Sequence, residues 1–255
     1  MKTRIYLMDT EPFRDEHIAA LVYQALPPSR RKKADRFRKP EDRQRSLAAG
    51  ALLLKLCEDE GLCPSMPDLT ENPYGKPFFS GHPEICFSLS HSGGKVILAV
   101  SDRAAGCDIE TVDPRINTGA IAERFYAPEE YRLLQAEPDP ALRTALFFRL
   151  WTLKESYVKA SGLGMYLPFQ NFCISVRDGL MPSVRQILPL PSELAAAVSE
   201  DVSFFEYDAG AEYRCALCVA NRGPAESGHA EPGLAKLPEK PELIPVLPAF
   251  PENQS

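Results

Sequence analysis

The sequence lacks any apolar run long enough to cross a membrane, and it lacks a net positive charge. No stretch reaches the about 18 consecutive apolar residues that a membrane-spanning helix needs. The segment Met1–Thr10 has no apolar core of the kind found in secretory signal peptides. The formal net charge of -6 argues against a dedicated nucleic-acid-binding protein, which is usually basic. These absences predict a cytoplasmic protein that contacts neither membrane nor nucleic acid.

The paired cysteine pattern of a secreted protein is also absent. Seven cysteines are scattered between Cys57 and Cys218, and some of them, such as Cys86 and Cys173, lie within apolar runs. This pattern favours buried free thiols in a reducing compartment. The lone pair Cys215 and Cys218 falls in a strand-like run, where a spacing of three directs the side chains to opposite faces. Two ordinary thiols are therefore expected there, not a metal or redox site.

What is present is an ordinary globular composition, with 44% hydrophobic and 25% charged residues in a chain of 255. Periodicity and turn signals predict helices over Glu11–Leu26, Arg30–Arg38, Pro40 to near Gly61, Ile116–Tyr126, Pro128–Gln135 and Ala141–Ala160. Strands are predicted at Arg4–Met8, Ile85–Ser90, Lys95–Ser101, Cys107–Thr111, Phe172–Val176, Val202–Tyr207 and Tyr213–Ala220.

This order predicts an α+β fold of two comparable halves, residues 1–104 and 105–222, although no internal sequence repeat proves a duplication. The composition changes after residue 222, because seven prolines fall in residues 223–255 and no periodicity survives. We therefore expect residues 223–255 to form a poorly ordered or surface-draped tail.

Two carboxylates alternate along the predicted strand Cys107–Thr111. Asp108 and Glu110 face one side, while Cys107 and Ile109 face the other. Their mutual repulsion would be relieved by a cation, and Mg²⁺ commonly takes one or two carboxylates together with phosphate oxygens. A third acid, Glu155, lies in the longest helix. The alternatives are a solvated acidic strand edge and a surface ion pair between Glu155 and Lys159, four residues on.

Basic residues concentrate in one short region of this acidic chain. The region Arg30–Arg45 suits phosphate oxygens, although a solvated helix face or a general polyanion site remains an alternative. Further along, Lys76 lies at a turn, and Ser90 and His91 lie at a strand end. Each of these is weak evidence taken alone.

In order along the chain, these segments resemble the Sfp-type 4′-phosphopantetheinyl transferases. The specific part is a G-x-D-x-E motif followed by W-x-x-K-E-S, and the resemblance spans most of residues 1–220. The matching stretches are Arg30–Gly50 (RRKKADRFRKPEDRQRSLAAG), Asn72–Pro77 (NPYGKP), Phe87–Ser92 (FSLSHS), Gly106–Glu110 (GCDIE), Arg124–Tyr131 (RFYAPEEY) and Trp151–Leu167 (WTLKESYVKASGLGMYL). Two positions depart from the usual pattern: Arg30 replaces a frequent lysine, and Cys107 replaces an aliphatic residue.

The resemblance implies two similar α+β halves in one chain, with coenzyme A in the cleft between them. It implies that Asp108, Glu110 and Glu155 hold Mg²⁺. It places a further set at positions that contact the coenzyme A phosphates or, for the serine at 46, lie near the adenine: Arg30, Lys33, Arg45, Ser46, Lys76, Ser90, His91 and Lys159. Because both halves belong to one chain, a monomer is expected.

The implied reaction is attack by a serine hydroxyl of an apo acyl or peptidyl carrier protein on the β-phosphorus of coenzyme A, with release of 3′,5′-ADP. Lys159 would lie over the transferring phosphate. Glu155 or Glu130 would take the serine proton, directly or through a water. The carrier would dock near Ile116–Leu134 and could serve fatty acid, polyketide or non-ribosomal peptide synthesis. A non-catalytic coenzyme A-binding module and a polyanion-binding protein are the competing readings.

Overall fold

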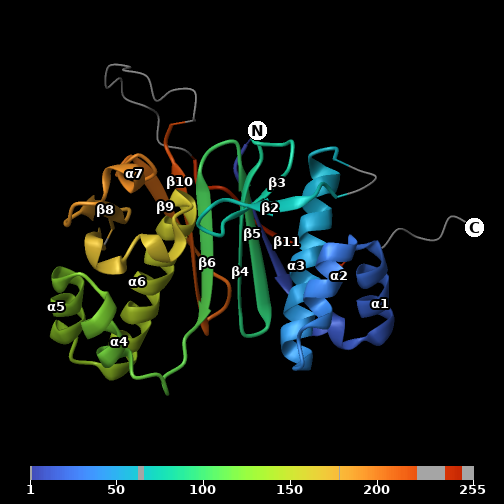
Figure 1. Cartoon of the computed structure of the whole chain (residues 1–255). Helices are drawn as coiled ribbons and strands as arrows, with labels where there is room; N and C mark the ends of the chain where they lie inside the picture. The colour runs from blue at the N-terminus through green and yellow to red at the C-terminus, as the bar shows by residue number, and fades with distance from the viewer. Residues whose placement is uncertain (1, 63–65, 178, 223–238, 249–255) are drawn as a thin grey trace, which may run out of the picture.

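The first half of the chain is a sheet covered on one face by helices. The computed structural model describes residues 2–62, 66–177, 179–222 and 239–248. The sheet has the order β11-β1-β5-β4, formed by β1 (Arg4–Asp9), β4 (Cys86–Ser92), β5 (Lys95–Ser101) and β11 (Leu243–Pro245). Three helices lie against it (Figure 1): α1 (Glu16–Ala25), α2 (Pro28–Asp35) and α3 (Pro40–Asp59). A separate hairpin, β2 (Leu69–Glu71) and β3 (Pro77–Phe79), follows α3.

The second half repeats this plan with a smaller sheet. Its strands have the order β6-β10-β9 and are antiparallel: β6 (Ala105–Thr111), β9 (Val202–Tyr207) and β10 (Tyr213–Ala220). Its helices are α4 (Thr118–Phe125), α5 (Pro128–Ala136), the long α6 (Pro140–Ser161) and the short α7 (Ser192–Ala195). The hairpin of β7 (Phe172–Ser175) and β8 (Ser183–Gln186) lies on the side of α6 away from the first half (Figure 1).

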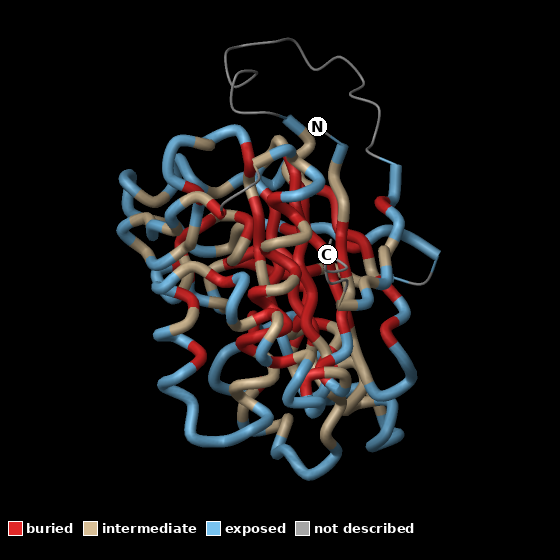
Figure 2. The backbone as a smooth tube through the Cα atoms, turned by 90° about the vertical axis from the view of Figure 1, so that its right-hand side faces the viewer, coloured by how far each residue is buried: buried red, intermediate tan, exposed pale blue. Residues whose placement is uncertain are grey.

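The two sheets face each other and share an apolar core, which gives the order helices, sheet, sheet, helices. Along β5, Ile97 and Ala99 point to the second sheet, while Val96, Leu98 and Val100 pack against the helices of the first half. A strand that is apolar on both faces reads as a continuous hydrophobic run. Figure 2 shows the buried backbone concentrated in these central strands. The predicted α+β class with two similar halves is confirmed.

Most predicted elements lie within a few residues of the observed ones, and the first helix is the main exception. The stretch predicted as one helix over Glu11–Leu26 is divided into a short 3₁₀ turn, Glu11–Arg14, and α1. The reason is a local cap: the Asp15 carboxylate accepts from the backbone N–H groups of His17 and Ile18, so the helix begins after it. Gly162 ends α6 in the left-handed conformation, as predicted.

The C-terminal region contains one segment that pairs with the first sheet. Residues 223–238 and 249–255, which belong to the predicted tail, lie outside the described residues. In between, Leu243–Pro245 forms β11, which pairs in parallel with β1 and is followed by a bond from the Val246 N–H to the Leu7 carbonyl (2.8 Å). Of the two predicted alternatives, this segment follows the surface-draped one, because it is ordered as an edge strand of the first sheet. Its apolar pattern is too short for periodicity to reveal it.

No helix in the described part of the chain is both long enough and apolar enough to cross a membrane. Cys86, Cys107, Cys173, Cys215 and Cys218 are free thiols, and all of them except Cys86 are buried. This agrees with the prediction of ordinary thiols at Cys215 and Cys218, which are both buried in β10.

Candidate active site between the two halves

The closest approach of α6 to β6 depends on one glycine. A Cβ atom at Gly106 would lie 2.1 Å from the Ser156 carbonyl oxygen and 2.3 Å from the Ala160 nitrogen. These are helix backbone atoms, which cannot move aside, so any other residue at this position would push the helix away. Gly106 thus allows α6 to bring Glu155 and Lys159 towards the carboxylates of β6.

Asp108 lies at the junction of β6, β4 and α6. Its side chain is buried, and its Oδ1 atom accepts from the Ser90 hydroxyl (2.6 Å) and from the Lys159 ammonium (2.6 Å). Lys159 also donates to Ser90 Oγ (3.0 Å), which closes a three-residue network. The other carboxylate oxygen, Oδ2, is buried and has no hydrogen-bond partner among the described residues. A buried, unpaired carboxylate oxygen is costly unless a ligand completes it.

The pKa values of the two neighbouring acids, Glu110 and Glu155, are raised. Glu110 accepts from the Ser92 hydroxyl (2.9 Å), yet burial and the charge of Asp108 raise the pKa of Glu110 to about 7. Burial also raises the pKa of Glu155. Burial alone would lower the pKa of Lys159, but the charges of Asp108 and Glu155 raise it above its ordinary value. The single ammonium therefore compensates the acids only in part.

The predicted metal ligands Asp108, Glu110 and Glu155 are neighbours that act on one another electrostatically. Within the described ranges, however, no three acidic, histidine or cysteine side chains converge as a ready metal cage. The unpaired Asp108 oxygen and the raised pKa values of the other two show that the protein leaves their charge incompletely balanced. Hard oxygen donors in this condition are suited to Mg²⁺.

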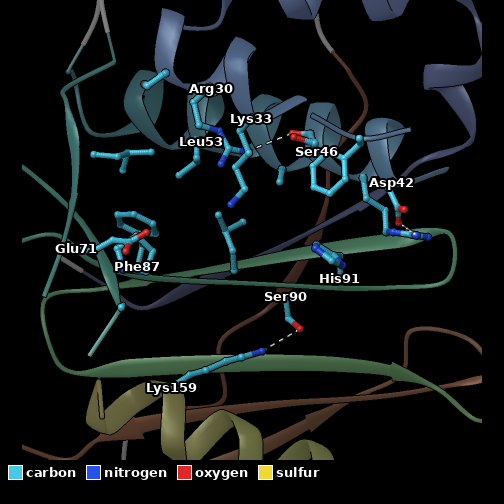
Figure 3. Close-up of a pocket in the computed structure, with 18 of the residues that line it drawn as sticks. Arg30, Lys33, Asp42, Ser46, Leu53, Glu71, Phe87, Ser90, His91 and Lys159 are labelled. Atoms are coloured by element: carbon cyan, nitrogen blue, oxygen red, sulfur yellow. Dashed lines mark hydrogen bonds and ion pairs between the residues drawn. The ribbon is translucent and has the colours of Figure 1, made fainter. Parts of the chain in front are cut away.

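A cavity of about 520 Å³ opens beside this network, between the helices of the first half and β4. Figure 3 shows Arg30 and Lys33 extending from the helices towards β4, with Lys159 on the far side of Ser90. Arg30 and Lys33 are three residues apart in α2 and so share one helix face. The predicted cofactor residues that line the cavity are Arg30, Lys33, Arg45, Ser46, Ser90, His91 and Lys159.

Polar groups on the cavity wall are left unsatisfied. Arg30 is only 7% exposed, donates from Nη2 to the Ser46 carbonyl (3.3 Å), and has a buried Nε without a partner in the described structure. The Ser46 hydroxyl is in the same condition. Desolvation lowers the pKa of both Arg30 and Lys33. Charge-assisted bonds from an anion would satisfy these donors, and phosphate geometry matches the arginine fork.

Comparison with known proteins identifies the chain. The sequence model of the 4′-phosphopantetheinyl transferase superfamily matches residues 104–218. A 4′-phosphopantetheinyl transferase of Bacillus subtilis is 35% identical over 199 residues, which cover 77% of this chain and 83% of the relative.

The chain belongs to the 4′-phosphopantetheinyl transferase superfamily.

Other relatives agree with this membership. The 4′-phosphopantetheinyl transferase Sfp of Bacillus subtilis strain 168 is 32% identical, again over 77% of this chain and 83% of the relative. The crystal structure of Helicobacter pylori holo-[acyl-carrier-protein] synthase in complex with coenzyme A aligns with 45% of this chain and 97% of its own at 22% identity, with a TM-score of 0.34. Membership in the superfamily rests on the sequence relatives.

Lys76 lies differently from the other predicted phosphate ligands of this transferase. Its ammonium does not line the cavity but donates to the carbonyl oxygens of Lys159 (2.7 Å), Ala105 (3.0 Å) and Ala160 (3.4 Å). In this geometry the Lys76 ammonium is occupied by backbone carbonyls, and its contact with a coenzyme A phosphate stays a prediction. A lysine at a turn carries no sequence signal that distinguishes a phosphate from a helix end.

Glu130, a predicted candidate base of the transferase, is enclosed in the core of the second half. It is 1% exposed; its Oε1 accepts from the Lys154 ammonium (2.7 Å) and the Ile174 N–H (2.7 Å), and its Oε2 from the Ala127 N–H (2.9 Å). Lys154 is 0% exposed and also donates to the Phe172 carbonyl (2.8 Å). These contacts join α5 to α6 and β7, and the role of Glu130 as a base stays a prediction.

A second cavity of about 560 Å³ was not predicted from the sequence. It is mostly apolar, and its lining includes Glu155 and Lys159. Lys159 therefore borders both cavities. From the predicted docking segment Ile116–Leu134 the second cavity takes only Arg124 and Phe125; the remaining residues come from α6 and the loop after it: Trp151, Val158, Gly164, Met165, Leu167, Pro168, Phe169 and Gln170. The available sequence signal was the run of large apolar residues Met165–Leu167 just after α6, and the structure leaves Met165 and Tyr166 exposed.

Proposed function

We propose that this chain transfers the 4′-phosphopantetheine group of coenzyme A to a serine hydroxyl of an apo acyl or peptidyl carrier protein. The observation that supports this best is that two sets of buried polar groups without partners lie on either side of Lys159. On one side lie buried cationic and hydroxyl donors without partners, and on the other lies a buried carboxylate oxygen without a partner. A nucleotide pyrophosphate together with its counter-ion would satisfy both sets.

The reaction forms one phosphorus–oxygen bond and breaks another. The carrier serine oxygen attacks the β-phosphorus of coenzyme A, the bond to the bridging oxygen breaks, and 3′,5′-ADP leaves with that electron pair. Arg30, Lys33, Arg45 and His91 hold the nucleotide end, with Ser46 near the adenine. Because phosphoryl transfer requires little covalent chemistry from the protein, positioning and charge neutralisation supply most of the rate.

Asp108, Glu110 and Glu155 are the residues that would hold Mg²⁺. When bound, the metal supplies positive charge to the pyrophosphate oxygens. Lys159 and Ser90 hold the Asp108 carboxylate in place, and Lys159 reaches towards the transferring group from the border of the two cavities. For the serine proton, Glu155 is placed better than Glu130, because Glu155 lines the second cavity and Glu130 is enclosed.

The carrier reaches the site from the second cavity, and a monomer suffices because both halves belong to one chain. We place the reaction in the reducing cytoplasm, which suits the free thiols of the described chain. Carriers of fatty acid, polyketide or non-ribosomal peptide synthesis all present the required serine. Light scattering on the purified protein tests the monomer.

The deciding experiment is mass spectrometry of an apo carrier protein incubated with the enzyme, coenzyme A and Mg²⁺, with and without EDTA. We expect the carrier serine to gain one phosphopantetheine group, and we expect EDTA to abolish the gain. Calorimetry with coenzyme A alone runs beside it. Binding of coenzyme A without transfer to several unrelated carriers would favour the non-catalytic coenzyme A module and overturn the proposal. Salt-dependent binding of nucleic acid without transfer would favour the polyanion reading.

A further inference from the structure

The turn Asn72–Lys76 of the first half is attached to the end of α6 in the second half. The Lys76 ammonium donates to the carbonyl oxygens of Lys159 and Ala160 in the last turn of α6. The Asn72 side-chain amide donates to the carbonyl of Gly162, just beyond the helix (2.9 Å). The last carbonyls of a helix have no partner within the helix and carry its partial negative charge, so a cation is stabilising there.

The turn is itself held in one shape. The Asn72 side-chain oxygen accepts from the backbone N–H groups of Tyr74 and Lys76 (2.9 Å each), and the Asn72 N–H donates to the Lys76 carbonyl (2.9 Å). An asparagine that bridges its own turn in this way restricts the backbone without help from the rest of the fold. The Lys76 side chain therefore extends from a turn whose backbone conformation is fixed.

Packing joins the turn to the second half as well. The Tyr74 ring contacts the Tyr166 ring edge-on, with centroids 5.1 Å apart, and Tyr74 packs against the core of the second half. A Cβ atom built on Gly162 would lie 3.2 Å from Lys76 Cδ and 3.3 Å from Asn72 Nδ2. The turn thus covers the end of α6 closely from the first half.

The residue held by this contact is the one that borders both cavities. Lys76 bonds the backbone carbonyl of Lys159, while the side chain of Lys159 bonds Asp108 and Ser90. A third bond from Lys76, to the Ala105 carbonyl, ties the same ammonium to the start of β6, the strand that carries Asp108. One ammonium therefore fixes the helix and the strand of the site relative to each other.

We propose that Lys76 is a positioning residue, which acts through the α6 end and Lys159 and not on the coenzyme A phosphates. Asn72 has the same role through Gly162. This inference rests on the proposed transfer reaction. It predicts that loss of either side chain lowers the rate of the chemical step and leaves the affinity for coenzyme A largely intact.

Kinetics of Lys76→Met, Asn72→Ala and Lys33→Met test the proposal. For Lys76→Met we expect kcat to fall about ten- to a hundredfold, since small displacements of catalytic groups are costly, while KM for coenzyme A changes less than about threefold. Asn72→Ala should show the same pattern with a smaller fall. Lys33, which lines the cavity, is the matched control, and Lys33→Met should raise KM instead. A Lys76→Met variant with raised KM and unchanged kcat, or an Asn72→Ala variant that behaves as wild type, would overturn the proposal.

Hydrogen exchange measured by mass spectrometry gives a readout that does not depend on activity. Peptides that cover residues 158–164 should exchange faster in both turn variants and at the wild-type rate in Lys33→Met. Unchanged exchange in the turn variants would contradict the inferred contact. If the wild type transfers no phosphopantetheine, the proposed function is wrong. If the wild type is active but Lys76→Met raises KM and leaves kcat unchanged, only the proposed role of Lys76 is wrong. Should Lys76→Met fail to fold, Asn72→Ala carries both tests.

Discussion

Two lysines of α6 pair with carboxylates from other elements, and the two pairs show how differently this protein surrounds buried charge. Inside the second half, Lys154 and Glu130 are paired at 2.7 Å, and backbone groups satisfy what remains of both. At the junction of the halves, Lys159 and Asp108 are paired at 2.6 Å, but one Asp108 oxygen is left unpaired. We interpret a buried charge network in which every polar group has a partner as structural. A network in which a polar atom lacks a partner can accept a ligand.

The same contrast extends beyond the pairs. The cavity beside Asp108 is lined by Arg30 and Ser46, and within the described structure the Arg30 Nε atom and the Ser46 hydroxyl have no hydrogen-bond partner either. Breaking the pair in the core should therefore cost stability, and changing the junction should cost activity.

Lys154→Met should destabilise the fold by about 3–5 kcal/mol, because it leaves the Glu130 charge buried without its counter-ion. Urea unfolding followed by circular dichroism measures this. The double variant Lys154→Met/Glu130→Gln should regain part of the loss, since no unpaired charge remains. A Lys154→Met protein of wild-type stability without activity would mean that the core pair is functional, and the division would fail.

Asp108→Asn should lower the transfer rate about a hundred- to a thousandfold, the usual effect of removing one charged group from the stabilisation of a transition state. The change keeps the side-chain shape, so the melting temperature should move by only a few degrees. Single-turnover transfer and thermal unfolding are measured on the same sample. Glu130→Gln is the matched acid in the core, and we expect its rate per folded molecule to stay within about tenfold of wild type.

Arg30→Gln should weaken coenzyme A binding about ten- to a hundredfold, which is the effect expected for hydrogen bonds from a charged donor. In the absence of coenzyme A its melting temperature should be unchanged or higher, because a buried, incompletely bonded guanidinium is removed. Calorimetry and thermal unfolding check the two parts. A loss of stability with unchanged affinity would place Arg30 in the structural class, with Lys154.

His91 should titrate below the ordinary histidine range in the free protein. Desolvation, followed by the positive charges of Arg45, Lys159 and Lys33, lowers its pKa. Because the folded state takes up this proton less readily than the unfolded chain, stability should fall as the pH drops below about 6.5 and passes through the lowered pKa. Bound phosphate should raise the pKa of His91. The affinity for coenzyme A should therefore increase as the pH falls through the same range.

An NMR titration with and without coenzyme A checks the His91 prediction, with His91→Gln to assign the signal. A pKa at or above the ordinary value in the free protein would contradict it. So would an affinity that does not change with pH.

Much of this architecture could be read from local patterns. Periodicity and helix-end signals predict the apolar strands β5 and β10, the two ends of α6 and the alternation in β6. The structure agrees closely with these predictions. The G-x-D-x-E and W-x-x-K-E-S motifs are also sufficient to indicate the superfamily. Alternation correctly separated Asp108 from its buried neighbours Cys107 and Ile109.

Tertiary contacts decided the roles of individual charges. Local sequence does not reveal that Glu130 is enclosed while Glu155 lines a cavity, or that Lys76 bonds a helix end while Lys33 lines a cavity; distant segments decide these surroundings. The same holds for β11, whose few residues become a strand because β1 offers a free edge. Local sequence patterns are enough to indicate the elements, the family and the set of charged residues near the site. Only the folded structure decided which of those charges are completed by the protein and which are left for a ligand, because burial and pairing depend on groups far apart along the chain.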